Sequence, residues 1–453
     1  MTNFIPTDEQ KQAMTLVRDF LDTRRKDSFL LEGFAGTGKS TLVNHILKDY
    51  YLKGQLIAVS AFTNKATNII SRKTPFAESI TLYRLLGLQA NQESDVLSFG
   101  KSRSLVRNFN IIVLDEVSMI KDSEFEFLMT ELNKCKGLFR PKLLLMGDPF
   151  QLPPVGQDNE SIAFNVENKF QLKNVIRQSV NSNILDYSMK IRKVLEQITQ
   201  TDTNVPIQTK LGYTEGNDFR HFNNSKSFIE SVLEDFNSDS YKRSSDYVKV
   251  IAYRNNTINV VNNIIRKNIF GANTDTISIN ENLMLNSPVY DPFTSYVLYN
   301  SSDEIVVDEI EDVKIYEGTH LGVKIKFPYY MCDVRRKYDD IGACMNIVNP
   351  SHYDMFNEYL NEWASQIKKL PAKEAKEIFR TEFYPFKKAY HCPSYNYAIT
   401  SHKSQGSTYN KAYVIEDDIE KVKQASSKDL WKSKYVACTR PSKQLNILNR
   451  IKG

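Results

Sequence analysis

Three glycines lie within six residues in the segment LLEGFAGTGKST, residues 30–41, of a chain that has 17 glycines in 453 residues. Gly33, four further residues and Gly38-Lys39-Ser40 match the spacing of a phosphate-binding P-loop. Backbone N–H groups can wrap phosphate oxygens where no Cβ intrudes, and the start of a helix adds partial positive charge. We therefore predict that Lys39 reaches the terminal phosphates of a nucleoside triphosphate and that Ser40 binds Mg²⁺. The alternative, a glycine-rich turn with a solvated lysine, is disfavoured by the strand pattern before the segment and the helical pattern after it.

Two adjacent carboxylates follow four apolar residues in IIVLDEVSM, residues 111–119. Phosphoryl hydrolysis needs one carboxylate that holds Mg²⁺ and another that orients or deprotonates the attacking water. Asp115 suits the first role and Glu116 the second. A lone acidic pair is usually a solvated turn, but its place after a P-loop favours the catalytic interpretation.

A third polar segment, LLLMGDPFQLPPVG at residues 143–156, also follows an apolar strand pattern. Gln151 carries an amide that can donate to a γ-phosphate and accept from water, so we predict that it distinguishes ATP from ADP. The alternative is an ordinary surface glutamine in a proline-rich loop.

Two arginines are candidates for the stabilisation of transition-state charge. Arg177 lies in NVIRQS and Arg440 in KYVACTRPSKQL. If both face a nucleotide held between two domains, they act as arginine fingers. Taken alone, either is an ordinary surface ion-pair residue that contributes little.

Two loops combine hydroxyls, amides, rings and lysines: AFTNKAT at 61–67 and NYAITSHKSQGST at 396–408. Such groups suit a nucleic-acid backbone, and Phe62 could stack a base. The candidate phosphate contacts are Thr63, Asn64, Lys65, Ser401, His402 and Lys403. The alternative for each loop is that its hydroxyl or amide caps the following helix.

Composition limits the class of protein. A net charge of +5, from 59 basic and 54 acidic residues, permits a nucleic-acid partner without requiring one. The five cysteines lack CxxC spacing, which fits a reducing compartment and argues against a zinc site. No apolar run approaches the ~18 residues of a membrane helix, and no signal peptide is evident. We expect a soluble protein of the bacterial, or phage-infected host, cytoplasm.

The elements that position these residues alternate between strand and helix. Residues 28–175 show a β-α-β pattern that predicts an α/β fold with ligands at the strand C-terminal ends. A polar stretch at 86–108, which could form a short hairpin, interrupts it. The pattern returns at 248–270 and 395–450, and the residues between alternate like antiparallel strands before an amphipathic helical stretch, 355–383, broken near Pro371.

In this order, the segments resemble the motifs of a superfamily 1 helicase of the B class, which contains RecD and Dda-like members. GFAGTGKST is similar to motif I, AFTNKAT to motif Ia, and ITLYRLL (80–86) to the DNA-contacting motif after it. VLDEVSM resembles motif II and GDPFQLPPVG motif III. TSHKSQGST resembles motif V, YVACTRP resembles motif VI, and Arg177 matches the motif IV arginine.

The resemblance implies two RecA-like domains with ATP in their cleft. It places the first at residues 1–175, with a DNA-splitting wedge at 86–108, and the second at 176–285 plus 391–453. Residues 286–390 would form an inserted β-barrel-like domain with a helical arm. Leu97 and Phe99 are the candidate wedge residues.

The resemblance also assigns site residues. The expected nucleotide contacts are Gln10, which matches the adenine-reading glutamine, and Gly33, Gly36, Thr37, Gly38, Lys39, Ser40, Thr41 and Gly406. Thr81 and Tyr83 are added to the expected DNA contacts. The family pattern has proline at the place of Phe62 and histidine at that of Tyr83, so individual DNA contacts differ here.

The implied function is an ATP- and Mg²⁺-dependent DNA helicase that moves 5′ to 3′ on single-stranded DNA. Its expected partners are single-stranded DNA and a DNA fork, and no membrane is expected among them. We expect a monomeric chain and leave replication or recombination proteins open as further partners. Two alternatives are a single-strand translocase that displaces bound proteins with little unwinding, and a P-loop ATPase that is not a helicase.

Overall fold

The computed structural model describes residues 4–450 except 24–25, 62–63, 91–96, 100–102, 138–139, 155, 158, 177–181, 202–210, 272–275, 292–296, 338 and 421–425. The chain forms two compact units. The first unit comprises Met1–Gly87, Arg103–Ile258 and Ala398–Gly453, and the second comprises Leu88–Ser102 and Asn259–Tyr397.

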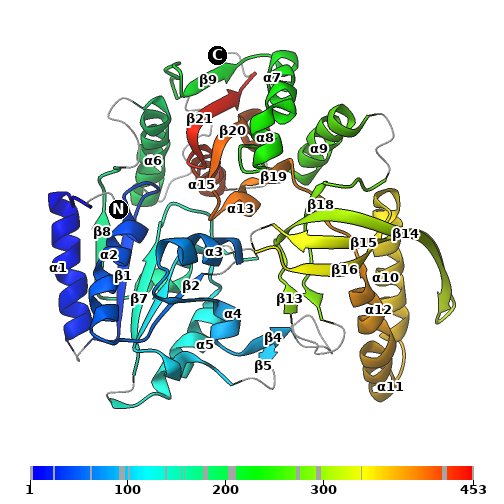
Figure 1. Ribbon diagram of the computed structural model, residues 1–453, viewed down its shortest axis with the longest axis horizontal. Helices are drawn as coiled ribbons and strands as arrows, with labels where there is room; N and C mark the ends of the chain where they lie inside the picture. The colour runs from blue at the N-terminus through cyan, green and yellow to red at the C-terminus, as the bar shows by residue number, and fades with distance from the viewer. Residues whose placement is uncertain are drawn as a thin grey trace. The chain divides into compact units, whose positions relative to one another are not determined.

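The first unit contains a parallel sheet with the strand order β3-β2-β6-β7-β1-β8. Figure 1 labels its strands β1, β2, β7 and β8. Its strands are β1 (Ser28–Gly33), β2 (Ile57–Ala61), β3 (Glu78–Thr81), β6 (Ile111–Leu114), β7 (Lys142–Gly147) and β8 (Lys169–Leu172). The central strands are apolar and buried along their length, as a parallel sheet covered on both faces requires. β1, β6 and β7 therefore end beside one another, which brings the P-loop, the paired carboxylates and the Gln151 segment to one edge.

A second parallel sheet in the same unit has the order β19-β10-β20-β21-β9. Its strands are β9 (Phe219–Phe222), β10 (Val248–Ala252), β19 (Ala398–Thr400), β20 (Tyr409–Ile415) and β21 (Pro441–Leu448). β19 pairs with β10 in a parallel register that joins Ile251 to Ile399. The second β-α pattern thus folds as a sheet of its own, as predicted.

The helices of the first unit connect these strands. They are α1 (Asp8–Asp22), α2 (Lys39–Leu52), α3 (Asn64–Lys73), α4 (Leu82–Leu85), α5 (Asp122–Asn133), α6 (Asn183–Thr201), α7 (Ser225–Asn237), α8 (Asp239–Arg243), the start of α9 (Asn255–Phe270), α13 (Ser401–Ser404), α14 (Glu416–Glu420) and α15 (Ser427–Cys438). Apolar residues of α1 and α2 pack on β1, β2 and β7 in one core that includes Val17, Leu42 and Leu144.

The second unit is built on a mainly antiparallel sheet with the order β17-β16-β15-β14-β11-β18. Its elements are β11 (Asn282–Met284), β14 (Glu304–His320), β15 (Val323–Arg336), β16 (Gly342–Val348), β17 (Tyr390–His391), β18 (Ser394–Tyr395), a two-stranded pair β12 (Val289–Tyr290) and β13 (Val297–Tyr299), and the helices α10 (Tyr353–Ile367), α11 (Ala372–Ile378) and α12 (Tyr384–Ala389). β14 and β15 form the long curved hairpin that Figure 1 shows beside α10 and α12.

An aromatic core fixes the helices to this hairpin. Phe327 of β15, Phe356 and Trp363 of α10, and Phe383 are all buried in one cluster. The helical stretch breaks at Pro371, as its sequence predicts, because proline donates no backbone N–H within a helix.

The polar stretch at 86–108 does contain a hairpin, because β4 (Leu88–Ala90) pairs antiparallel with β5 (Leu97–Phe99). The compact units divide the chain differently from the predicted domains: both parallel sheets fall in the first unit, and the hairpin strands fall in the second. Among the described residues, no helix is both long and apolar enough to span a bilayer.

Candidate active site

The P-loop joins β1 to α2 in the geometry that its glycines predict. Gly36 and Gly38 adopt φ angles of 86° and 82°, where a side chain is strained. A Cβ on Gly33 would lie 2.8 Å from Thr37 Oγ1 and 3.1 Å from Leu172 Cβ, so this position excludes a larger residue. Lys39 Nζ donates to the carbonyl of Gly33 and, at 3.2 Å, to that of Phe34, which holds the ammonium over the loop.

The paired carboxylates lie where β6 ends. Asp115 is buried and its Oδ1 accepts from the backbone N–H of Glu116 at 2.9 Å. Burial raises the pKa of Asp115 to about 6, the Glu116 carboxylate adds to the increase, and Lys39 opposes it. Glu116 adopts a φ of 54°, a left-handed conformation that costs a residue with a side chain about 1–3 kcal/mol and that clusters at functional sites.

The segment after β7 places two further groups at this edge. Asp148 is fully buried, and its Oδ2 accepts from the backbone N–H of Ala35 in the P-loop at 3.1 Å. Gln151 is 4% exposed, and its Oε1 has no hydrogen-bond partner among the described residues. A buried polar atom without a partner is rare, so this oxygen is available to a bound molecule.

The second sheet contributes Arg440, which follows α15. Its guanidinium donates to Val436 O at 3.0 Å, to Ser407 O at 3.3 Å and to Thr439 Oγ1 at 3.1 Å, and the residue is 5% exposed. These contacts hold the arginine at the edge of the second sheet.

A cavity of about 380 Å³ brings these groups together within the first unit. The predicted site residues that line it are Gln10, Gly36, Gly38, Lys39, Ser40, Thr41, Asp115, Glu116, Gln151, Gly406 and Arg440. Gln10 lies close to the loop, since its Nε2 donates to Thr37 O at 3.2 Å and its Oε1 accepts from Thr7 N at 3.1 Å. Both parallel sheets therefore share one cavity.

The cavity fits a nucleoside triphosphate with Mg²⁺. Among the described residues no side chain caps the start of α2, so the N–H groups of its first turn face the cavity without a side-chain acceptor. The Ser40 hydroxyl and the Asp115 carboxylate line the same space and are the oxygen donors that Mg²⁺ prefers. A bound cation would also favour the ionised form of Asp115.

Comparisons with known proteins agree with this geometry. A family model described as an AAA domain matches residues 7–208. The uncharacterized protein R530 of Acanthamoeba polyphaga mimivirus is 28% identical over 98% of this chain and 99% of its own length. The ATP-dependent DNA helicase Dda of Enterobacteria phage T4 is 24% identical over 67% of this chain and 68% of its own.

The structural likeness extends over both sheets. A Pif1 helicase structure, from work on DNA unwinding at forked double-stranded DNA by two coordinating Pif1 helicases, has a TM-score of 0.51. It is 17% identical in sequence, and the match covers 99% of this chain and 93% of that one. The chain is similar in sequence to Dda and similar in fold to Pif1. The fold shared with Pif1 is an α/β fold with two RecA-like parallel sheets.

The residues that the helicase motifs assign to DNA are only partly described. Phe62 and Thr63 lie outside the described residues, and so does Arg177, one of the two candidate arginine fingers. For Asn64 and Lys65 of α3, and for Leu97 and Phe99 of β5, the structure describes the backbone and not the side chains.

The candidate DNA-contacting residues whose side chains the structure describes differ in their exposure to solvent. Lys403 is exposed and His402 is half-buried. Burial lowers the pKa of His402 and Asp429 opposes this, so the imidazole is suited to hydrogen bonding more than to charge pairing. The structure differs from our prediction at Ser401, whose fully buried hydroxyl donates to Ala252 O at 3.4 Å.

Other residues of the predicted DNA-contacting segments make hydrogen bonds within the first unit. Thr81 caps α4 by accepting from Arg84 N, and Thr400 caps α13 by accepting from Lys403 N, the alternative that we considered for the loop at 396–408. Tyr83 is turned inward, and its hydroxyl donates to Glu124 Oε1 at 2.8 Å. Tyr83 therefore fixes α4 to α5.

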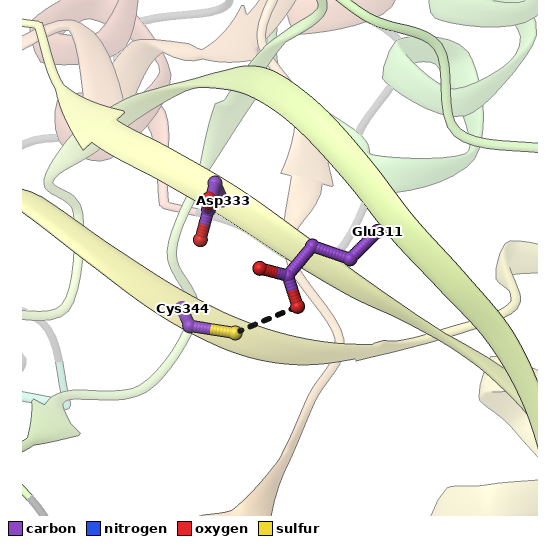
Figure 2. Close-up of side chains that lie close together, drawn as sticks. All are labelled: Glu311, Asp333 and Cys344. Carbon is purple, nitrogen blue, oxygen red and sulfur yellow. Dashed lines mark hydrogen bonds between the residues drawn. The ribbon is translucent and has the colours of Figure 1, made fainter.

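A second group of polar side chains lies outside the cavity. Figure 2 shows Glu311, Asp333 and Cys344, which come from three neighbouring strands of the second unit and whose ligand atoms all lie within 4.8 Å of one another. Burial and the two carboxylates raise the pKa of the Cys344 thiol, which donates to Glu311 Oε2 at 3.9 Å. A protonated, surface thiol is a poor metal ligand, so we assign no ion to this group.

Tyr435 is a residue of the site that our reasoning from the sequence missed. Its phenol oxygen lies 2.8 Å from Asp148 Oδ2 and 3.3 Å from Ala35 N. The segment YVACTRP indicated Arg440 but carried no signal for this tyrosine, because its partners lie 287 and 400 residues away in the chain.

Proposed function

We propose that the chain is an ATP-dependent DNA helicase that moves 5′ to 3′ along single-stranded DNA and separates duplex. One observation carries the proposal: a single cavity is lined by the P-loop of one RecA-like sheet and by Arg440 of the other. A nucleotide bound there contacts both sheets, so its hydrolysis can change how they grip a strand. The similarity to Dda and Pif1 supports DNA as that strand.

The residues of the cavity divide the chemistry among them. Lys39 and the N–H groups that start α2 bind the phosphates, because they supply charge and donors in one place. Glu116 orients or deprotonates the attacking water. Gln151 senses the γ-phosphate through its amide N–H groups, while its partnerless amide oxygen can accept from the attacking water. Arg440 neutralises charge in the transition state.

Mg²⁺, held by Ser40 and Asp115, would neutralise charge on the β- and γ-phosphate oxygens. Ser40 and Asp115 line the same cavity as Lys39. Burial raises the pKa of Asp115 to about 6, and a cation bound there would oppose this shift by favouring the ionised carboxylate.

The loops at 61–67 and 396–408 are the proposed DNA contacts, and the β4–β5 hairpin is the proposed wedge. Their position in the chain supports this role, since α3 follows β2 and α13 follows β19 at the strand ends. The five cysteines are free, which supports a reducing compartment such as the cytoplasm.

Steady-state ATP hydrolysis with and without a single-stranded oligonucleotide tests the proposal. We expect hydrolysis to rise strongly with DNA, and a forked duplex to be unwound. Hydrolysis that is equally fast without DNA would indicate a P-loop ATPase of another kind. DNA-stimulated hydrolysis with displacement of bound protein and no unwinding would indicate a translocase.

Deletion of residues 91–96 should reduce unwinding and leave DNA-stimulated hydrolysis in place, because a wedge takes no part in phosphate chemistry.

A further inference from the structure

One oxygen atom of α15 contacts both the P-loop and the end of β7. The Tyr435 hydroxyl donates to Asp148 Oδ2 at 2.8 Å and accepts from Ala35 N at 3.3 Å. Ala35 N also donates to the same Asp148 oxygen, at 3.1 Å. Three groups from three segments thus share one junction, and Asp148 and Tyr435 are both fully or almost fully buried.

Aromatic contacts surround this junction. The Phe150 ring lies edge-on to the Tyr435 ring at 6.5 Å and stacks on Phe34 of the P-loop at 5.6 Å. Burial raises the pKa of Tyr435 well above its ordinary value, and the Asp148 carboxylate adds to this, so the phenol remains a donor at neutral pH. A buried hydrogen bond to a carboxylate is among the stronger ones that a protein makes.

Two other contacts join the two RecA-like sheets without reaching the P-loop. Lys432 Nζ of α15 pairs with Glu160 at 2.9 Å, and Gln405 Nε2 donates to Leu152 O at 3.1 Å. The three hydrogen bonds of Arg440 go to its own sheet. Tyr435 is therefore placed to transmit the position of the P-loop to the arginine.

We propose that Tyr435 is a positioning residue that sets the distance between Arg440 and the phosphates, an inference that rests on the proposed ATP hydrolysis. Tyr435 lies on the last turn and a half of α15, and Arg440 follows the end of that helix. Because α15 is buried from Leu430 to Cys438, a displacement of Tyr435 moves the arginine with it. The hydrogen bonds of the Tyr435–Asp148–Ala35 junction hold Tyr435, and therefore α15, in one position relative to the P-loop.

The test is Tyr435→Phe, which removes the hydroxyl and keeps the ring. We expect kcat of DNA-stimulated ATP hydrolysis to fall by about 10-fold or more, the effect of one hydrogen bond to a charged group. KM for ATP should stay within about 2-fold, because the phosphate-binding groups of the P-loop and α2 are retained. Asp148→Asn tests the same bond from its other end, and the double variant should lose no more than the worse single one.

A matched control comes from Tyr413, which is also buried and donates to a carboxylate, Asp235 Oδ2, at 2.6 Å. Tyr413 lies on β20 and its hydroxyl bonds to α7, away from the cavity. Tyr413→Phe should destabilise the fold by a similar amount and leave kcat unchanged. A fall in kcat that is equal in both variants would overturn the proposal, because it would reflect lost stability.

A second double-variant cycle separates positioning from a local effect. In an Arg440→Ala background, Tyr435→Phe should cause no further loss in single-turnover hydrolysis, since the group that it positions is gone. An additional loss of the same size as in the wild type would overturn the proposal, and so would a normal kcat in Tyr435→Phe. Absence of DNA-stimulated hydrolysis in the wild type would instead contradict the proposed function itself.

Discussion

At the scale of single residues, Glu116 is the group whose removal should separate binding from chemistry. Glu116 lines the same cavity as Lys39, and its backbone has a left-handed conformation. We expect Glu116→Gln to bind ATP as the wild type does and to lower kcat by at least about 100-fold, the usual contribution of a general base. Fluorescent-nucleotide binding and ATP hydrolysis measure the two effects.

The control for this variant is Glu126→Gln, which alters an exposed carboxylate on α5 in the same unit. It should change neither quantity. Lys39→Ala should behave differently from Glu116→Gln and lose affinity for ATP as well as turnover. If Glu116→Gln hydrolyses ATP at the wild-type rate, the general base for the attacking water must be another residue.

His391 provides a pH prediction in the second unit. Burial lowers the pKa of His391 from 6.5 to about 4, and its Nδ1 has no partner among the described residues. The unfolded chain therefore binds a proton before the folded chain does, so stability is full above pH ~6.5 and is lost as the pH falls toward 4. At about 1.36 kcal/mol per pH unit, the loss between pH 7 and pH 5 is about 2 kcal/mol.

His391→Leu should remove this pH-dependent loss, while His45→Leu, which alters an exposed histidine of α2, should keep it. The chain has two tryptophans, Trp363 in the second unit and Trp431 in the first. In a Trp431→Phe background, urea unfolding followed by fluorescence reports the second unit alone. An equal pH dependence in wild type and His391→Leu would contradict the prediction.

The residues of the nucleotide site could be predicted because their chemistry requires neighbours in sequence. A P-loop needs glycine, lysine and serine at fixed spacing, and a carboxylate pair needs two adjacent acids. The orientation of single side chains could not be predicted in this way. Ser401 and Tyr83 lie in the expected segments but direct their hydroxyls inward, and Tyr435 has partners that only the tertiary fold brings near.

At the scale of elements, one buried ion pair joins α9 to the start of β11. The Arg266 guanidinium bonds both carboxylate oxygens of Glu281, and the two side chains are 1% and 0% exposed. The guanidinium also stacks on Tyr395 at 3.9 Å and donates to Thr276 O at 2.7 Å. Arg266→Met should destabilise the second unit by about 3–5 kcal/mol, because it leaves Glu281 buried without its cation.

The matched control is Arg335→Met, which breaks the pairs with Asp308 of β14 and with Asp340 in the turn after β15. Arg335 is 43% exposed in its side chain, so this change should cost less than about 1 kcal/mol. The same fluorescence-detected unfolding measures both variants. Equal losses of unfolding free energy in Arg266→Met and Arg335→Met would contradict the prediction, because they would show that burial of the ion pair does not determine the loss.

The strands were predictable where both faces are buried and less so at the sheet edges. Apolar runs of the sequence coincide with β1, β2, β6 and β7. β3 and β8 were missed, since they lie at the two edges of the first sheet and have mixed side chains, ESIT and KFQL. An edge strand buries less of its surface, so its sequence carries a weaker periodic signal.

At the scale of the whole molecule, direction of movement is the main prediction. Partial duplexes with a 5′ or a 3′ single-stranded tail measure it directly. We expect preferential unwinding of the 5′-tailed substrate, because the similarity to Dda favours the B class of superfamily 1. The direction depends on which sheet binds the DNA strand more firmly as the cavity closes. Preferential unwinding of the 3′-tailed substrate would contradict the B-class direction and leave the assignment of the ATP site unchanged.

The order of the strands in the second sheet has a consequence for synthesis on the ribosome. β10 ends at Ala252, yet its neighbours β19 and β20 and the strand β21 that joins β20 to β9 all come after residue 397. At about 5–20 residues per second, β10 waits roughly 10–40 s before β21 has been made. The first sheet, complete at Leu172, can fold during this time. The nascent chain meanwhile exposes the strand VKVIA with two unpaired edges, which favours chaperone binding until β19 and β20 have been made.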